Sequence, residues 1–351
     1  MHSFDYSNTP WRMLSPDVVK LLTALYEEKG RQELYFETAP DALNALKKQA
    51  LIESSQYANT IMGRVATTDR VRALVSNSAV PENKPEEEIA GYREVLSTIY
   101  QNYSSIVICP QTILQLHRQL FGYSASVKGG EFKDVDDVLF ETCDDGKKME
   151  RFRTVSAENT EKALNELCKN FNEAIMAGTY DPLLLISQFA LDFLCIHPFH
   201  EGSGRISRLL VLLLLYKAGF FAGMYVSLER ILENSREVYY DALRRCSNGW
   251  HENSNNYLPF VRYFLGLFLK VYRDFNDRVA SNRKGSLSKA DRIWMVFEKK
   301  VGQVRKSDIS AFCPDVSQTT IERALSDLLK QNMIIKVGNG RGAAYIKNIE
   351  K

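Results

Sequence analysis

Apolar residues recur at three- and four-residue intervals along most of the chain, which is the pattern of helices with one buried face. Two later segments, 183–196 and 206–218, are apolar almost throughout and predict central helices that are buried on most sides. The sequence therefore predicts a mainly α fold whose centre lies where these two helices are joined. The earlier segments with helical spacing are 15–30, 41–55, 86–103, 113–121 and 160–177.

One segment breaks the helical pattern. Residues 129–152 contain glycines, acidic residues and a short Val-Leu-Phe stretch, which the turn-like sequence Asp-Asp-Gly at 144–146 follows. Such a segment is typical of two short strands joined by a turn. We therefore expect a β-hairpin here, lying over the helices.

The last part of the chain has a pattern of its own. Residues 276–288 are polar and rich in small side chains, which favours a linker. Three helix patterns then precede a hairpin pattern over 333–347, whose turn contains three glycines. This order predicts a small winged helix-turn-helix domain over 289–351.

The composition is that of an ordinary globular chain. Of the 351 residues, 45% are apolar and 25% are charged, which is enough apolar material for buried cores. The length predicts about two domains. The longest apolar run, 209–216, is too short for a membrane span, and the N-terminus does not resemble a secretory signal. The six cysteines lack the spacing of a metal site. We expect a cytoplasmic protein without a membrane partner.

Charge divides unevenly along the chain. From Arg283 onward, 14 Lys and Arg stand against 7 Asp and Glu, whereas residues 1–282 carry 31 against 36. Arg323, on the third helix pattern, and Arg341, in the turn, suit contacts with nucleic-acid phosphates. Residues 284–351 thus have DNA as a candidate partner, although winged helices also dimerise or bind proteins.

The segment 197–208, with the sequence HPFHEGSGRISR, joins the two apolar helices. Gly202 and Gly204 allow the backbone to turn its N–H groups toward the start of the second helix, where the helix dipole also favours an anion. Arg205 and Arg208 lie three residues apart on the first helical turn and suit further phosphate oxygens. These features predict a site for a polyphosphate.

Two more side chains of this segment supply chemistry. Glu201 offers the hard oxygen ligand that Mg²⁺ prefers when it is shared with phosphates. His197 can accept a proton from a hydroxyl near neutral pH. Together with the anion site, they predict phosphoryl or nucleotidyl transfer. His117 and His200 lack this context, and we interpret both as structural.

The same segment resembles the signature of the Fic family, His-x-Phe-x-(Asp/Glu)-Gly-Asn-Gly-Arg-x-x-Arg. It departs from the signature only at Ser203, where the family has an Asn that holds a nucleotide phosphate. The resemblance extends over about 20–275. It implies a Fic-type helical bundle with a short β-hairpin flap, and relatives often carry a winged helix after it.

The resemblance also implies an activity: transfer of AMP from ATP, with Mg²⁺, to a Ser, Thr or Tyr hydroxyl of a protein, the enzyme itself included. Homodimers are common among Fic proteins. By position, the implied roles are base for His197, Mg²⁺ ligand for Glu201, anion hole for Gly202, Ser203 and Gly204, and phosphate contacts for Arg205 and Arg208.

Further roles follow from the resemblance outside the signature. Lys133, Asp134, Val135 and Asp136 belong to the flap that would hold the target segment by strand addition. Tyr239 and Tyr240 fall near the expected nucleotide pocket, while core packing is an equal alternative for both. The implied divisions are an N-terminal helical region 1–110, a catalytic core 111–275, a linker 276–288 and a winged helix 289–351.

Many Fic proteins restrain themselves with a helix bearing (Ser/Thr)-x-x-x-Glu-(Gly/Asn), whose Glu pairs with the second signature arginine. Residues 53–74 resemble that helix, but Ala58 stands at the Ser position and Met62 at the Glu position, with Gly63 retained. Methionine cannot form the ion pair. We therefore predict a degenerate inhibitory motif and little autoinhibition.

Two alternatives to AMP transfer remain open. One is a winged-helix DNA-binding regulator in which the Fic domain senses a nucleotide. The other is a Fic enzyme that uses another phosphate-containing donor.

Overall fold

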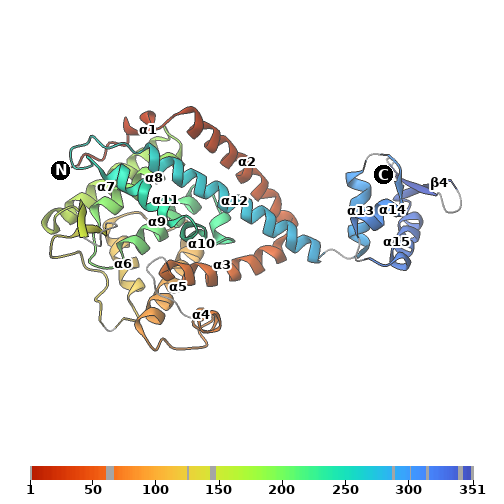
Figure 1. Ribbon diagram of the computed structural model, residues 1–351, viewed down its shortest axis with the longest axis horizontal. Helices are drawn as coiled ribbons and strands as arrows, with labels where there is room; N and C mark the ends of the chain where they lie inside the picture. The colour runs from red at the N-terminus through yellow and green to blue at the C-terminus, as the bar shows by residue number, and fades with distance from the viewer. Residues whose placement is uncertain are drawn as a thin grey trace. The chain divides into compact units, whose positions relative to one another are not determined.

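The computed structural model describes residues 2–60, 67–124, 126–142, 148–286, 289–300, 302–313, 316–338 and 343–348. The chain forms two compact units, 1–277 and 278–351, each of which is described by itself (Figure 1). No helix in these ranges is long and apolar enough to cross a membrane.

In the described residues of the first unit the regular structure is helical apart from one hairpin, which confirms the prediction of a mainly α fold. The helices expected from apolar spacing are all present, and most begin one to three residues earlier than the apolar pattern. Four of those that begin earlier have a proline at the first or second helical position, namely Pro40, Pro85, Pro110 and Pro182. In chain order the first helices are α1 (Thr9–Arg12), α2 (Pro16–Thr38), α3 (Pro40–Thr60), α4 (Thr68–Val75), α5 (Lys84–Asn102), α6 (Pro110–Leu120) and α7 (Ala157–Ala177).

Helices α8 (Pro182–Ile196) and α9 (Ser203–Lys217) form the centre of this unit, and Figure 1 shows them next to each other. Almost every side chain of both helices is buried, as their unbroken apolar sequences predict. Helix α8 begins where the Asp181 side chain accepts a hydrogen bond from Leu183 N at 2.8 Å, and it ends at His197. The connection 197–202 is therefore held between two buried helices.

The remaining helices of the unit surround this pair. They are the short η1 (Ala222–Met224), α10 (Leu228–Glu233), α11 (Arg236–Ser247) and the long α12 (Leu258–Ser286). Helix α12 continues through most of 276–288, so the expected linker is helical as far as Ser286. Small polar residues can continue a helix when the residues before and after them are good helix formers.

The expected hairpin is present. Strands β1 (Val138–Thr142) and β2 (Lys148–Arg153) pair antiparallel, with an irregularity in register between Leu139 and Phe140. Thr154 N donates to Asp137 O at 3.2 Å and Val155 N to Cys195 O at 3.4 Å. The base of the hairpin is thus tied to the end of α8.

The second unit contains three helices and a three-stranded sheet. Helices α13 (Lys289–Lys299), α14 (Lys306–Phe312) and α15 (Gln318–Lys330) match the three helix patterns, and Ser317 caps α15 as expected. Strands β4 (Ile334–Val337) and β5 (Ala344–Lys347) form the expected hairpin, and β3 (Val304–Arg305) adds to β5. The two-residue β3 is too short to leave a pattern in the sequence.

Candidate active site

His197 lies at the C-terminal end of α8 in a left-handed backbone conformation, with φ 48° and ψ 67°. Such a conformation is uncommon for a residue with a side chain, and it persists only where the surroundings hold it. Here His197 N donates to Phe193 O at 3.0 Å. Lys133 holds the neighbouring carbonyls: its Nζ donates to Ile196 O and its backbone N to Pro198 O, both at 3.0 Å.

Lys133 is almost completely buried, and burial lowers the pKa of its ammonium group to about 8. Its Nζ also donates to Thr154 Oγ1 at 2.6 Å. The Lys133 side chain therefore points inward and supports the His197 backbone. Its assignment to the target-binding flap stays a prediction.

The loop after His197 closes on itself through Ser203. The hydroxyl of Ser203 accepts from Phe199 N and donates to Phe199 O, both at 3.1 Å. Its proton is therefore not available to a phosphate, so that any contact of Ser203 with an anion comes from its backbone N–H. Gly202 precedes it with φ 94°, and a Cβ there would lie 2.8 Å from the Phe121 ring, so glycine is required.

Both signature arginines are buried beside the end of α3. Arg205 Nη1 lies 3.4 Å from Asn59 Oδ1 and its Nη2 lies 3.6 Å from Glu88 Oε1. Arg208 Nη2 donates to Ala58 O at 3.1 Å. The structure thus brings the predicted inhibitory position Ala58 against Arg208, whereas Met62 and Gly63 lie outside the described residues.

Glu201 is partly exposed, and its carboxylate lies 3.1 Å from Lys84 Nζ at the start of α5. The carboxylate thus already pairs with a cation, next to a loop whose backbone N–H groups suit an anion. This donor set fits an Mg²⁺ ion that keeps several waters and is shared with phosphates. Within the described ranges, no cluster of three or more His, Cys, Asp or Glu side chains is arranged to hold a metal.

His117 has the structural role that we expected. Its Nδ1 accepts from Gly130 N at 2.8 Å, so its Nε2 carries the proton and donates to Glu201 O at 2.9 Å. The ring stacks on Phe199 with centroids 3.7 Å apart, and burial lowers the pKa of the imidazole to about 4. His117 therefore stays neutral and fixes the signature loop to the segment before the hairpin.

The flap carboxylates have three different partners. Asp134 Oδ1 lies 2.5 Å from His200 Nε2 on the surface, and Asp136 Oδ1 accepts from Ala157 N at 2.8 Å. Asp137, which our sequence interpretation missed, has its Oδ2 2.8 Å from His197 Nδ1. This contact lowers the pKa of the Asp137 carboxyl. The run of acidic residues was the available signal, but a run does not indicate which carboxylate faces the histidine.

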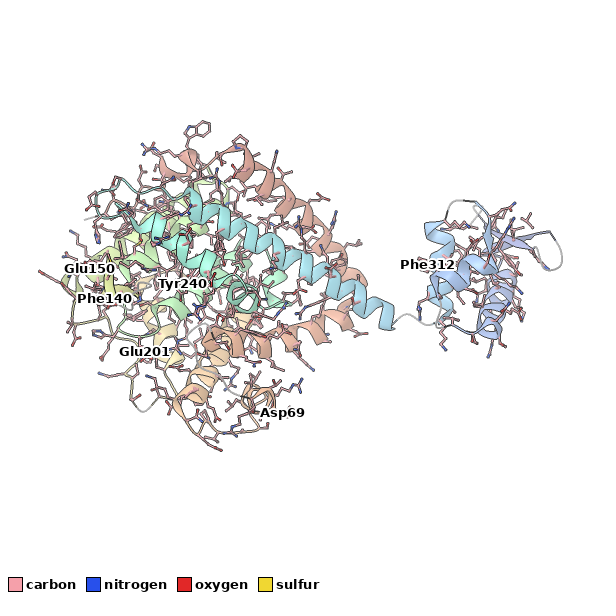
Figure 2. All side chains as sticks on the ribbon, viewed as in Figure 1. Asp69, Phe140, Glu150, Glu201, Tyr240 and Phe312 are labelled. Atoms are coloured by element: carbon pink, nitrogen blue, oxygen red, sulfur yellow. The ribbon has the colours of Figure 1, made fainter. Side chains whose placement is uncertain are left out.

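The signature loop opens into a cavity of about 460 Å³, a size typical of small-molecule sites. The predicted residues His197, Arg205, Arg208 and both tyrosines line it together with residues 200–204. Figure 2 labels three lining residues from different elements: Phe140 from β1, Tyr240 from α11 and Glu201 from the loop. The other lining residues are Leu139, Arg151, Phe152, Leu191, Leu194, Cys195, Leu243 and Ser247.

The two tyrosines differ in exposure. Tyr239 is buried and its ring lies 5.7 Å from that of Tyr263, so it combines core packing with a place in the cavity wall. Tyr240 is 37% exposed, and its ring lies 5.3 Å from that of Tyr239. The four flap residues 133–136 precede β1 and are not among those that line the cavity. Lys133 contacts the end of α8 and Thr154, Asp134 contacts the loop, Asp136 contacts α7, and Val135 is exposed.

Comparison with known proteins assigns one segment of the chain to a family. Residues 107–215 match the Fic/DOC family. The chain is 27% identical over 230 residues to protein adenylyltransferase Fic of Nematostella vectensis, covering 62% of this chain and 46% of that protein. The chain is 26% identical over 278 residues to the protein of the same name from Drosophila melanogaster, and this match covers 74% of this chain and 48% of that protein. The chain thus spans about half the length of these relatives.

Solved structures agree on the fold. A Fic family protein from Desulfovibrio desulfuricans matches with a TM-score of 0.61 at 17% identity, covering 96% of this chain and 98% of that one. Residues 134–508 of Fic-1 from C. elegans match with a TM-score of 0.58 at 22% identity, covering 74% of this chain and 71% of that one. This likeness confirms the predicted Fic-type helical fold with its hairpin. From the signature loop and the family match, we conclude that residues 107–215 form a Fic/DOC segment of this chain.

Proposed function

We propose that the protein is an adenylyltransferase that transfers AMP from ATP to a hydroxyl group of a protein, itself included. One observation supports this more than any other: a histidine, a glycine loop at a helix N-terminus and two buried arginines line a single cavity of about 460 Å³. The similarity to adenylyltransferases named Fic supports the same reaction.

In the proposed reaction, Nε2 of His197 takes the proton of the acceptor hydroxyl. The hydroxyl oxygen forms a bond to the α-phosphorus of ATP, and the bond between that phosphorus and the bridging oxygen to the β-phosphate breaks. Pyrophosphate leaves and carries its charge with it. The backbone N–H groups at 202–204 and the guanidinium groups of Arg205 and Arg208 would stabilise the negative charge of the phosphates.

Glu201 would hold Mg²⁺, which neutralises phosphate charge when it is bound. Tyr240 would contribute an exposed aromatic surface beside the nucleotide. The target segment would lie along the hairpin, whose Phe140 and Met149 are exposed apolar side chains. An exposed hairpin edge can pair with an extended segment through its backbone.

We also propose that autoinhibition is weak. Among the described residues, Arg208 donates to the Ala58 carbonyl, a neutral acceptor, at 3.1 Å. Hydrogen bonds between a neutral and a charged group are weaker than those between two ions. A phosphate of ATP would therefore displace this contact more easily than it would displace a glutamate.

Intact-mass measurement tests the proposal. The full chain, incubated with ATP, Mg²⁺ and a cell lysate, should gain the mass of AMP on itself or on a lysate protein. His197→Ala should remove this adduct, whereas His251→Ala, which changes a histidine outside the cavity, should keep it. An adduct of a different mass would favour another phosphate-containing donor, and no adduct with any nucleotide would contradict transfer.

DNA binding by residues 284–351 is a second candidate function. Arg323 is exposed on α15, and Lys336 is exposed on β4; Arg341 lies outside the described residues. The full chain should bind duplex DNA at low salt and lose affinity as salt rises. Arg323→Ala should weaken the binding.

Homodimer formation stays a prediction, which a measurement of the molecular mass in solution would test.

A further inference from the structure

The segment 133–137 holds His197 from two sides. Lys133 binds the carbonyls of the residues before and after His197, which fixes the backbone. Asp137 lies at the other end of the segment, and its Oδ2 is 2.8 Å from the imidazole Nδ1. Because Thr154 Oγ1 accepts from Lys133 Nζ at 2.6 Å and donates to Asp137 O at 2.9 Å, the two ends are joined to each other.

We propose that Asp137 is the positioning residue of His197. An ionised carboxylate can only accept, so a hydrogen bond across this contact requires the proton to be on Nδ1. The lone pair of the neutral ring is then on Nε2, the nitrogen that is left for the cavity. A carboxylate behind a histidine also stabilises the imidazolium that forms when the ring takes a proton.

The neighbouring carboxylates do not have this role. Asp134 pairs with His200 at the surface, and Asp136 accepts from the first residue of α7. Asp137 alone among the three contacts His197 in the described part of the chain. Its side chain is 30% exposed, less than that of Asp134 at 87%. The Asp137 carboxylate is therefore the group that selects one tautomer of the base.

The kinetic consequence rests on the proposed function. If His197 is the base, Asp137→Asn should lower kcat on the order of 10²-fold, the lower end of what a positioned base contributes. KM for ATP should hardly change, because Asp137 is not among the lining residues of the cavity. Asp137→Glu keeps the carboxylate and should recover part of the loss. Glu131→Gln makes the same chemical change at an exposed site and should leave kcat unaltered.

A second measurement does not depend on turnover. In full chain labelled with ¹⁵N-histidine, the ring nitrogens of His197, assigned by their absence in His197→Ala, should report a protonated Nδ1. In Asp137→Asn the amide can donate to Nδ1, so the signal should shift toward the form with a protonated Nε2. The fold of the variant is checked by the unchanged signals of His117, whose two nitrogens have partners elsewhere.

The outcomes separate the two proposals. A tautomer that responds to Asp137→Asn in a chain that transfers no AMP supports the positioning role and contradicts the proposed function. The role of Asp137 is wrong if the His197 ring signals are the same in both proteins. It is also wrong if the chain transfers AMP and Asp137→Asn retains the kcat of the unchanged chain.

Discussion

Arg208 donates from Nη2 to the carbonyl oxygen of Ala58 at 3.1 Å, across 150 positions of sequence. The contact joins the second signature arginine to the last turn of α3. Asn59, the next residue, lies against Arg205 in the same way, with 3.4 Å between Oδ1 and Nη1. Helix α3 therefore covers both arginines with neutral oxygen atoms. This arrangement makes the proposed phosphate site sensitive to any charge added at the end of α3.

We predict that Met62→Glu lowers automodification by about 10- to 100-fold. A carboxylate on the segment after α3 would form charge-assisted hydrogen bonds with Arg208, each contributing roughly 1.5–3 kcal/mol. ATP would have to break them before its phosphates reach the arginine. Labelling with radioactive ATP measures the effect. Met62→Gln has a similar shape without the charge and should label like the unchanged chain; equal labelling of the Glu variant would show that the alignment with the inhibitory helix is wrong.

The ion pair between Lys84 and Glu201 gives a second prediction. The ammonium group lies 3.1 Å from the carboxylate that we propose as the Mg²⁺ ligand, so the two cations compete for it. Because an exposed pair contributes about 0.2–1 kcal/mol, Lys84→Met should lower the half-saturating Mg²⁺ concentration by up to about fivefold. Lys84→Arg keeps the charge and should change little. A higher Mg²⁺ requirement in Lys84→Met would instead indicate that Lys84 binds the phosphates.

Much of the helical architecture and the location of the site could be predicted because each depends on a short stretch of sequence. The apolar runs around 197–208 require two buried helices, and the glycines between them indicate a loop at a helix N-terminus. The single departure at Ser203 was also visible. The structural role of Ser203 could not be predicted, because its two hydrogen bonds to Phe199 depend on how the loop closes.

Contacts between distant segments could not be predicted in the same way. Asp134, Asp136 and Asp137 have the same chemistry within four positions, and only the irregular path of the chain before β1 determines that Asp137 meets His197. Lys133 has a side chain that is usually exposed, but here it is buried beneath the hairpin. The order of residue types does not specify the path of the backbone, and this path determines which of these side chains meet.

Stability should depend on pH through His117. Burial lowers the pKa of its imidazole from 6.5 to about 4, so the unfolded chain binds this proton more readily than the folded one. The contribution is therefore fully present above pH 6.5 and is lost as pH falls toward 4, by on the order of 3 kcal/mol. Denaturant unfolding at several pH values measures it. His117→Gln should be less stable at neutral pH, and the difference between the two proteins should shrink with acid; a constant difference would contradict a neutral, buried ring.

The last prediction concerns Ser203, whose hydroxyl makes both hydrogen bonds that close the signature loop. Ser203→Ala leaves the buried Phe199 N–H without this acceptor, which costs roughly 1–3 kcal/mol. The loop would relax, and the backbone N–H groups that we propose for the phosphates would no longer be held in place. We expect kcat/KM for ATP to fall about 10-fold or more, less than the roughly 10²–10³-fold cost of removing one oriented donor, because the donors are loosened and not removed. Ser203→Thr retains the hydroxyl and should lose less. If Ser203→Ala transferred AMP as well as the unchanged chain, the other contacts of the loop would be enough to hold it, and the side chain at 203 would have no part in forming the site.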